Sequence, residues 1–169
     1  MDVRHFSYKV VCGPTGSGKS RLLAALDQTG HQVLDLEGLV QHRGSVLDRL
    51  PGQPQPAQKW FDSLLLQRLQ QLDPSQPVFV EAESKKIGSV ALPVTLFDAM
   101  HASPCLKVEV PMAVRVAGLL EDYRHYVDNP ELFIEHLKPL YKFHGAEKMQ
   151  QWSEMIRAAA NWTRCSPNC

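Results

Sequence analysis

One eight-residue stretch constrains this chain more than any other feature: Gly13-Pro14-Thr15-Gly16-Ser17-Gly18-Lys19-Ser20. It fits the pattern G-x-x-x-x-G-K-[ST]: the glycines let backbone N–H groups approach phosphate oxygens, the lysine reaches the terminal phosphates and the hydroxyl can ligate Mg²⁺. An apolar run precedes it at residues 8–12, and an amphipathic run follows at residues 19–28, as expected for a strand and a helix. The pattern predicts a strand–loop–helix unit that binds a phosphorylated ligand through residues 13–20 and Arg21.

Short β-rich runs alternate with helical runs along the first two thirds of the chain. Such alternation is typical of βαβ units, so we expect an α/β fold of the P-loop NTPase-like kind, a three-layer αβα arrangement with a mainly parallel sheet. After Pro111 the pattern is helical, which predicts a helical C-terminal extension. We expect strands at residues 8–12, 32–36, 78–81 and 106–110, and helices at residues 19–28, 57–72, 94–100, 113–126, 131–140 and 146–161.

This pattern also predicts a domain organisation. We expect a linker at residues 1–7, a P-loop core domain at 8–128, a helical C-terminal subdomain at 129–162 and a flexible tail at 163–169. The boundary near residue 129 rests on Asn129-Pro130, a pair that interrupts the helical pattern.

The composition of the chain argues against two classes of partner, nucleic acid bound by overall charge and the membrane. The chain has 169 residues with 18 Lys plus Arg against 18 Asp plus Glu, so it is not a basic nucleic-acid binder overall and would need a local patch to contact RNA. No run approaches the ~18 apolar residues of a membrane helix, so we expect no membrane partner. None of the four cysteines stands in a C-x-x-C pair, and we interpret them as reduced thiols of a cytoplasmic protein.

Acidic residues follow two of the expected strands. Glu81 and Glu83 end the third strand, and Asp35 and Glu37 end the second, each pair at i and i+2 and therefore on one side of an extended chain. We predict Mg²⁺ ligation by Ser20, Glu81 and Asp35, and substrate or RNA contacts by Glu37 and Glu83. Solvated strand ends and an ordinary polar loop are the alternatives.

Basic residues near these strands are candidates for contacts with phosphate or substrate. We assign catalytic roles to Lys19, Glu81, Arg43 and Arg115, since Arg115 opens a helix after the fourth strand as a lid arginine does. His42, Lys85 and Lys86 are substrate or RNA candidates. The alternative for each is a solvated surface side chain.

Several blocks of the sequence resemble one enzyme family. These are residues 13–23, residues 32–39 (QVLDLEGL) with His42-Arg43-Gly44-Ser45, residues 78–88 (VFVEAESKKIG), and Arg115 with Asp122-Tyr123. Together they resemble the P-loop domain of bacterial tRNA 2-selenouridine synthase, over about residues 10–162. The D-L-E-G-L-x-x-H-R-G-S block is the most specific of these similarities.

The resemblance implies an activity and partners. The family joins a rhodanese-like domain to this P-loop domain and converts 2-thiouridine at the wobble position of tRNA to 2-selenouridine with selenophosphate, through a geranylated intermediate. The rhodanese-like domain and its catalytic cysteine are absent here, and residues 163–169 (TRCSPNC) do not resemble the family's longer helical end. We therefore expect part of a longer enzyme, with weak tRNA binding through a local patch.

The identity of the phosphate ligand remains open at this point. The cofactors expected are Mg²⁺ with ATP, GTP or geranyl diphosphate. No N-K-x-D sequence is present, which argues against a guanine-specific GTPase. Two other functions fit the motif: a small-molecule kinase, with Asp35 and Glu37 as substrate-binding acids, and a nucleotide-gated RNA-binding module.

Overall fold

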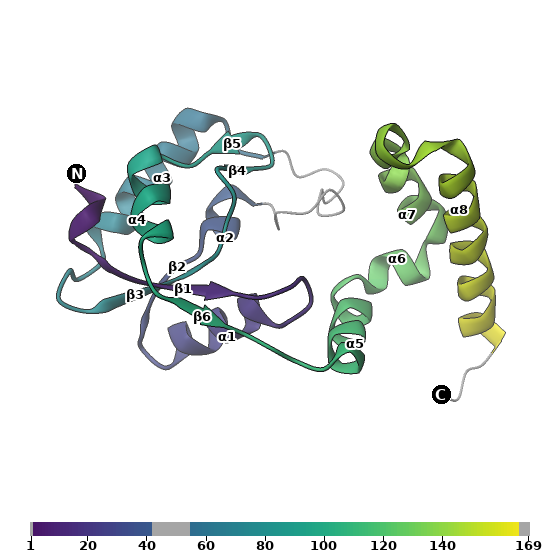
Figure 1. The fold of residues 1–169 in the computed structure, drawn as a ribbon, viewed down its shortest axis with the longest axis horizontal. Helices are drawn as coiled ribbons and strands as arrows, with labels where there is room; N and C mark the ends of the chain where they lie inside the picture. The colour runs from purple at the N-terminus through teal and green to yellow at the C-terminus, as the bar shows by residue number, and fades with distance from the viewer. Residues whose placement is uncertain (1, 42–54, 166–169) are drawn as a thin grey trace. The chain divides into compact units, whose positions relative to one another are not determined.

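A parallel sheet of four strands forms the centre of the fold (Figure 1). We analysed a computed structural model that describes residues 2–41 and 55–165, with side chains as far as residue 160. The strand order is β2-β3-β1-β6, and every adjacent pair is parallel, which confirms the predicted α/β class. The strands are β1 (Ser7–Cys12), β2 (Gln32–Leu34), β3 (Pro77–Glu81) and β6 (Cys105–Lys107).

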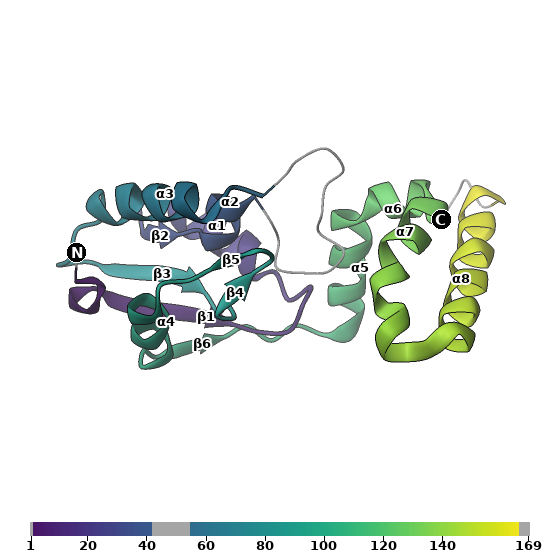
Figure 2. The same ribbon diagram turned by 90° about the horizontal axis from the view of Figure 1, so that it is seen from above.

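Alternating side chains of these strands build two cores, one on each face of the sheet. Val10, Leu34 and Val80 belong to the larger core, together with apolar residues of α2 (Leu36–Val40), α3 (Gln58–Gln70) and α4 (Val94–His101). Val11 and Val33 face the other way and pack with Leu23 of α1 (Lys19–Gln28). Helices therefore cover both faces, as in a three-layer αβα arrangement, with α2, α3 and α4 on one face and α1 on the other (Figure 1). Figure 2 shows the four strands of the sheet side by side.

The helix α3 shows how the apolar spacing selects the buried face. Phe61, Leu65 and Leu69 recur every four residues, and all three are buried in the larger core. Residues at this spacing lie on one side of a helix, so the pattern both predicts the helix and identifies its inner face. The predicted span of residues 57–72 extends slightly beyond the observed one at each end.

Two segments differ from the predicted secondary structure. Residues 32–36 were expected to be extended, but β2 ends at Leu34 because Asp35 caps the short helix α2. No strand was predicted between residues 81 and 94, but the structure has a small antiparallel hairpin there, formed by β4 (Lys86–Ile87) and β5 (Val90–Ala91). Gly88 turns this hairpin with a φ of +61°, a conformation that suits glycine.

The interpretation of all four cysteines as reduced thiols is wrong for one pair. The structure joins Cys12 and Cys105 in a disulfide, with their Cα atoms 6.0 Å apart. The reason lies in the strand register: Val10 of β1 is opposite Cys105 of β6, so Cys12 lies diagonally across the strand pair. Sequence spacing did not predict this contact because 93 residues separate the two cysteines.

The chain divides into two compact units, residues 1–118 and 119–169. This division falls within α5 (Met112–Asp122), ahead of the predicted boundary near residue 129. In the first unit, a short 3₁₀ helix, η1 (Val3–His5), precedes β1. The second unit contains α6 (Arg124–Asp128), α7 (Pro130–Leu137), η2 (Lys138–Leu140) and α8 (Tyr141–Cys165).

The second unit has a small core of its own. Tyr126 is buried, its hydroxyl lies 2.5 Å from His136 Nδ1, and its ring stacks on Phe133. Asn129 caps α7 through its side chain, which accepts a hydrogen bond from the N–H of Leu132. In the described part of the chain, none of the helices has the length and apolar character needed to cross a membrane.

Candidate functional site

The candidate site is the loop that connects β1 to α1. Gly16 and Gly18 both have positive φ, 77° and 84°, so the loop takes a path that other residues adopt only with strain. Gly18 is the N-cap of α1, which places the positive end of the helix dipole at the loop. This is the geometry in which backbone N–H groups and a helix N-terminus favour a bound anion.

The first glycine of the loop lies where no side chain fits. A Cβ on Gly13 would lie 2.7 Å from Ser17 Oγ and 2.8 Å from the carbonyl oxygen of Val108. Both distances are shorter than ordinary van der Waals contact, and the second involves backbone that cannot rotate away. Gly13 therefore lets the loop pack directly against the segment that follows β6.

Two consecutive residues of α1 converge on one carboxylate. Lys19 Nζ lies 3.3 Å from Glu81 Oε1, and the Ser20 hydroxyl donates to Glu81 Oε2 at 3.1 Å. Glu81 is the last residue of β3 and is buried, with 9% of its surface exposed. The site thus combines the loop lysine, the loop hydroxyl and a strand-end acid within direct contact.

Two further carboxylates lie beside this contact. Glu37 of α2 and Glu83 just beyond β3 join Glu81 in a cluster whose ligand oxygens lie within 4.8 Å of one another. Burial and the charge of Glu81 raise the pKa of Glu83 from 4.5 to about 7. A backbone hydrogen bond at Ser84, the charge of Lys19 and a hydrogen bond with Glu37 oppose this rise. Three carboxylates this close would repel one another if all were ionised, so they suit a bound cation or a shared proton.

Asp35 is engaged in a local structural contact. Its Oδ1 accepts a hydrogen bond of 2.8 Å from the N–H of Gly38, which makes it the N-cap of α2. This cap starts the helix that carries Glu37 toward Glu81 and Glu83. Asp35 is outside the carboxylate cluster, although the sequence suggested it as a metal ligand.

The two possible roles of Asp35 can be separated by substitution. We expect Asp35→Ala to lower the free energy of unfolding by about 1 kcal/mol, because the N–H of Gly38 loses its acceptor. Asp35→Asn should retain nearly all of that stability, since asparagine caps helices as well as aspartate does. Urea denaturation measures both changes, and a Mg²⁺ titration of Asp35→Asn tests the predicted ligation: weakened Mg²⁺ binding in a fully stable variant would support it.

Arg115 contacts the phosphate-binding loop from α5. Its Nε and Nη2 donate hydrogen bonds of 3.1 and 2.9 Å to the carbonyl oxygen of Thr15. The guanidinium thus holds the loop through hydrogen bonds, although 100 residues separate Arg115 from Thr15 in the sequence. This places Arg115 beside the site, with its charge close to any anion in the loop.

The remaining predicted residues lie in different surroundings. Lys85 Nζ is 5.3 Å from the centre of the Phe97 ring, a cation–π contact, and Lys86 is exposed at the start of β4. Arg21 is exposed in the first turn of α1. His42 and Arg43, both predicted as substrate contacts, lie outside the described residues.

Two glutamines that the sequence did not single out hold the β4–β5 hairpin in place. Gln58 donates to the carbonyl oxygen of Ala91 at 2.9 Å and accepts from the N–H of the same residue at 2.8 Å. Gln55 likewise donates to the carbonyl oxygen of Ile87 at 3.2 Å and accepts from the N–H of Ser89 at 2.7 Å. Each amide mimics the backbone of a neighbouring strand, and no sequence motif marks such a role.

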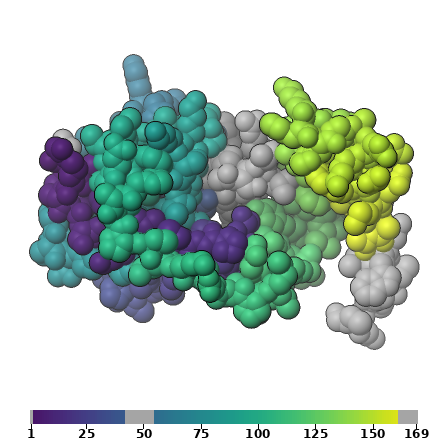
Figure 3. All heavy atoms as spheres, viewed as in Figure 1, coloured from purple at the N-terminus to yellow at the C-terminus, as the bar shows by residue number. Residues whose placement is uncertain are grey.

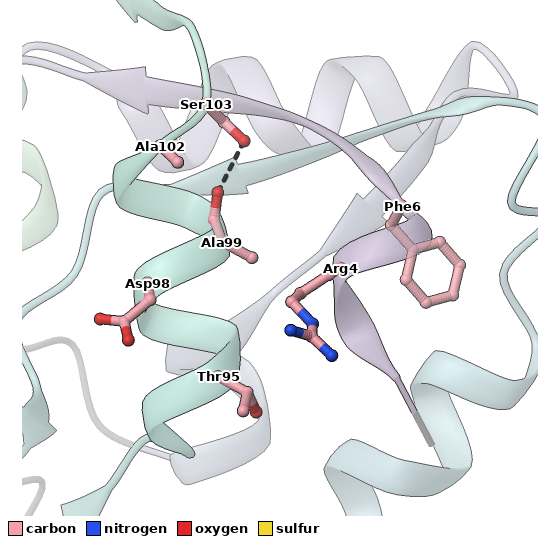
Figure 4. A pocket seen from close by; sticks show the side chains of 7 residues that line it. All are labelled: Arg4, Phe6, Thr95, Asp98, Ala99, Ala102 and Ser103. Carbon is pink, nitrogen blue, oxygen red and sulfur yellow. Dashed lines mark hydrogen bonds between the residues drawn. The ribbon is translucent and has the colours of Figure 1, made fainter.

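A cavity of about 430 Å³ lies at the other end of β1, away from the loop (Figure 4). Its lining combines small side chains of α4 with the η1 segment, and Ser103 Oγ donates to the carbonyl oxygen of Ala99 at its edge. No residue of the phosphate-binding loop or the acid cluster lines it. The lining residues are Arg4, Phe6, Thr95, Asp98, Ala99, Ala102 and Ser103.

Comparison with known sequences shows which proteins carry the same loop and acids. The profile of the tRNA 2-selenouridine synthase AAA domain matches residues 6–161. The chain belongs to this family. The match includes the phosphate-binding loop, all three acids of the cluster and Arg115, and it confirms the resemblance drawn from the sequence blocks.

Individual relatives agree with the profile. A tRNA 2-selenouridine synthase of Nitrosomonas europaea is 42% identical over 122 residues, which covers 70% of this chain and 31% of that protein. One from Aeromonas salmonicida is 39% identical over 120 residues, with coverage of 70% and 31%. One from Pseudomonas putida KT2440 is 33% identical over 174 residues, with coverage of 93% and 46%. The chain thus spans less than half the length of these relatives.

Proposed function

We propose that this chain is the phosphate-binding part of an enzyme that modifies tRNA, and that residues 13–20 hold the diphosphate group of its ligand. The convergence of Lys19 and Ser20 on Glu81 carries this proposal. A lysine, a hydroxyl and a carboxylate in contact beside a helix N-terminus form the set of groups with which proteins bind a magnesium diphosphate. The family name adds tRNA as the substrate of the relatives.

The residues present fit a Mg²⁺ ion. Ser20 Oγ and the oxygens of Glu81, Glu37 and Glu83 are hard donors, which Mg²⁺ prefers over softer ligands. We infer that Ser20 and Glu81 hold the ion, with Glu37 or Glu83 beside it. When bound, Mg²⁺ would neutralise part of the charge on the diphosphate.

The chain's own groups then have distinct roles. Lys19 forms an ion pair with Glu81 in the structure. Once that carboxylate binds a cation, the ammonium group of Lys19 can bind a phosphate oxygen instead. The loop backbone and the N-terminus of α1 stabilise negative charge, including charge that develops on a departing diphosphate. Arg115 fixes the loop through Thr15 and adds positive charge near the same position.

The reaction we propose is the conversion of 2-thiouridine at the tRNA wobble position to 2-selenouridine. In this scheme geranyl diphosphate is the ligand of the loop, and diphosphate is the leaving group when the thiouridine sulfur is geranylated. A rhodanese-like domain elsewhere in the full-length enzyme would carry the rest of the chemistry, in the cytoplasm. Partial coverage of the relatives is consistent with a further domain.

Competition for the loop identifies the ligand. A fluorescent nucleotide bound to the chain in the presence of Mg²⁺ is titrated with ATP, GTP and geranyl diphosphate. We expect geranyl diphosphate to displace it at the lowest concentration. Displacement by ATP or GTP alone, with no effect of geranyl diphosphate, would refute the prenyl version and favour a nucleotide as the natural ligand.

A small-molecule kinase is the second candidate, because three acids stand beside the loop. Glu37 and Glu83 could accept the proton of a substrate hydroxyl while Lys19 and Mg²⁺ hold the nucleotide. A screen of small alcohols and nucleosides for substrate-dependent ATP consumption distinguishes the two functions. ATP consumption that depends on one such compound would favour the kinase.

A further inference from the structure

The disulfide between Cys12 and Cys105 joins the entrance of the phosphate-binding loop to the edge of the sheet. Cys12 is the last residue of β1 and directly precedes Gly13, the first residue of the loop. Cys105 is the first residue of β6, which pairs with β1 alone in the part of the chain that the structure describes. The bond therefore links the strand that leads into the loop to the outermost strand of the sheet (Figure 2).

The two cysteines differ in their exposure to solvent. All three residues of β6 are exposed, Cys105 among them, whereas Cys12 is half-buried. In the space-filling view, the green segment that contains β6 lies at the surface beside the purple strand with which it pairs (Figure 3). Thiol–disulfide exchange requires that a thiolate reach a sulfur atom, so Cys105 is the position at which a small thiol can attack.

Three contacts connect the segment after β6 to the loop. The N–H of Val108 donates a hydrogen bond of 2.7 Å to the carbonyl oxygen of Cys12. The carbonyl oxygen of Val108 packs against Gly13, only 2.8 Å from the place of a Cβ atom on that residue. Further along the same segment, Arg115 donates two hydrogen bonds to the carbonyl oxygen of Thr15. The position of this segment therefore helps to set the path of the loop.

The disulfide reinforces a strand that has few other contacts to hold it. The strand β6 has three residues and lies at the open edge of the sheet, with backbone hydrogen bonds to one neighbour. A covalent link between residues 93 positions apart restricts the segment that carries the loop contacts. A site that is already ordered before its ligand arrives binds more tightly, because less freedom is lost on binding.

We propose that Cys12 and Cys105 form a reversible thiol–disulfide site, which small thiols reduce by attack at Cys105, and that the oxidised chain binds phosphate ligands more tightly than the reduced chain. The inference rests on the proposed function for its phosphate ligand and for a cytoplasmic location. Disulfides of cytoplasmic proteins are usually transient and act in catalysis or redox sensing. The site thus couples the redox state of the surroundings to the phosphate-binding loop.

Reduction of the bond takes two steps and consumes two small thiols. A thiolate attacks Cys105 Sγ and forms a mixed disulfide there, while the Cys12 thiolate leaves and takes up a proton. A second thiolate attacks the sulfur of the attached small thiol, so Cys105 leaves as a thiolate and the two small thiols leave as their disulfide. The cysteine pair gains the two electrons that the small thiols lose. The reverse steps, with the small-molecule disulfide as oxidant, restore the bond.

Peptide mapping tests whether the bond is reversible. The chain is equilibrated with glutathione at several ratios of thiol to disulfide, alkylated and digested without reductant, and mass spectrometry then identifies the linked peptides of Cys12 and Cys105. We expect the linked peptides at oxidising ratios and their loss at reducing ratios. If no ratio produced them, the site would be refuted. If excess reduced glutathione left them intact, the bond would be a permanent structural disulfide, which would also overturn the proposal.

Titration calorimetry with pyrophosphate and Mg²⁺ tests the coupling to the loop. We expect reduction to weaken binding at least about fivefold. Cys105→Ser should bind as the reduced chain does under both conditions. The double variant Cys165→Ser with Cys169→Ser is the matched control: it retains only the Cys12–Cys105 pair and should respond to reduction as wild type does. Equal affinities of its oxidised and reduced forms would overturn the coupling.

Two further outcomes separate this inference from the proposed function. Circular dichroism of the reduced chain should show the same helix content as that of the oxidised chain. A reduced chain that unfolds would overturn the coupling, because the disulfide would then act on the whole fold. Normal pyrophosphate binding that is indifferent to redox state would refute this inference alone. Absence of pyrophosphate binding in both redox states would refute the proposed function and the coupling together.

Discussion

Replacing Lys19 by alanine is expected to weaken the binding of inorganic pyrophosphate about 100-fold, or ~2.8 kcal/mol. Lys19 Nζ lies at the loop, 3.5 Å from the carbonyl oxygen of Pro14 and 3.3 Å from Glu81. Its charge-assisted hydrogen bonds to a phosphate are of the strong kind, and alanine removes all of them. Isothermal titration calorimetry with pyrophosphate and Mg²⁺ measures the change.

Two companion variants make this result specific. Lys59→Ala removes an exposed lysine of α3 and should leave pyrophosphate affinity unchanged. Glu81→Gln should strengthen pyrophosphate binding without Mg²⁺, because Lys19 loses its resting partner, and weaken it with Mg²⁺, because the ion loses a ligand. If Lys19→Ala bound pyrophosphate within threefold of the wild-type affinity, the loop lysine would not be a phosphate contact.

The sequence anticipated those parts of the structure that depend on local pattern. Helix α1 has the predicted bounds because the loop motif sets its start and Gly30, with a φ of 84°, follows its end. Helix α3 follows from the four-residue spacing of Phe61, Leu65 and Leu69. The parallel sheet follows from the alternation of strands with helices.

What the sequence did not anticipate depends on contacts between distant segments. The β4–β5 hairpin has only two residues in each strand, and Gln55 and Gln58 hold it from about 30 residues away in the sequence. The disulfide of Cys12 and Cys105 depends on which strands become neighbours. Strand order is a tertiary property, and no spacing within one segment encodes it.

Some residues of the candidate site could be predicted from local sequence pattern, and the roles of others depend on the folded structure. Residues 13–20 were evident from the motif alone, and Glu81 from its place at the end of an apolar run. Asp35 was predicted as a Mg²⁺ ligand and Glu37 as a substrate contact, both on one side of an extended strand end. The start of a helix at Leu36 separates them: Asp35 becomes the cap, and Glu37 joins the cluster.

The acid cluster makes the stability of the chain depend on pH in an unusual direction. Glu83 has a pKa of about 7 in the folded chain against an ordinary 4.5, so the folded state keeps its proton where the unfolded state loses it. Below pH 4.5 both states are protonated and the group has no effect. As pH rises from 4.5 to 7, the unfolded state is increasingly favoured, and above pH 7 the full destabilisation is present.

Glu83→Gln should therefore stabilise the chain at high pH alone. Allowing for the solvent that reaches the half-buried carboxyl, we expect a gain in the free energy of unfolding of about 2 kcal/mol at pH 8.5 and almost none at pH 4.5. Urea denaturation across this range, with a chelator to exclude divalent cations, measures the gain. Glu147→Gln, at an exposed position, should show no such trend.

The same experiment distinguishes a binding site from a structural feature. Mg²⁺ should reverse the pH trend of wild type, since a cation among Glu37, Glu81 and Glu83 stabilises the ionised carboxylates. Glu83→Gln should respond less to Mg²⁺ because one donor has lost its charge. A gain for Glu83→Gln that is equal at pH 4.5 and 8.5 would contradict the raised pKa. If Mg²⁺ left the free energy of unfolding of the wild type unchanged, the three acids would share a proton and would not bind a cation.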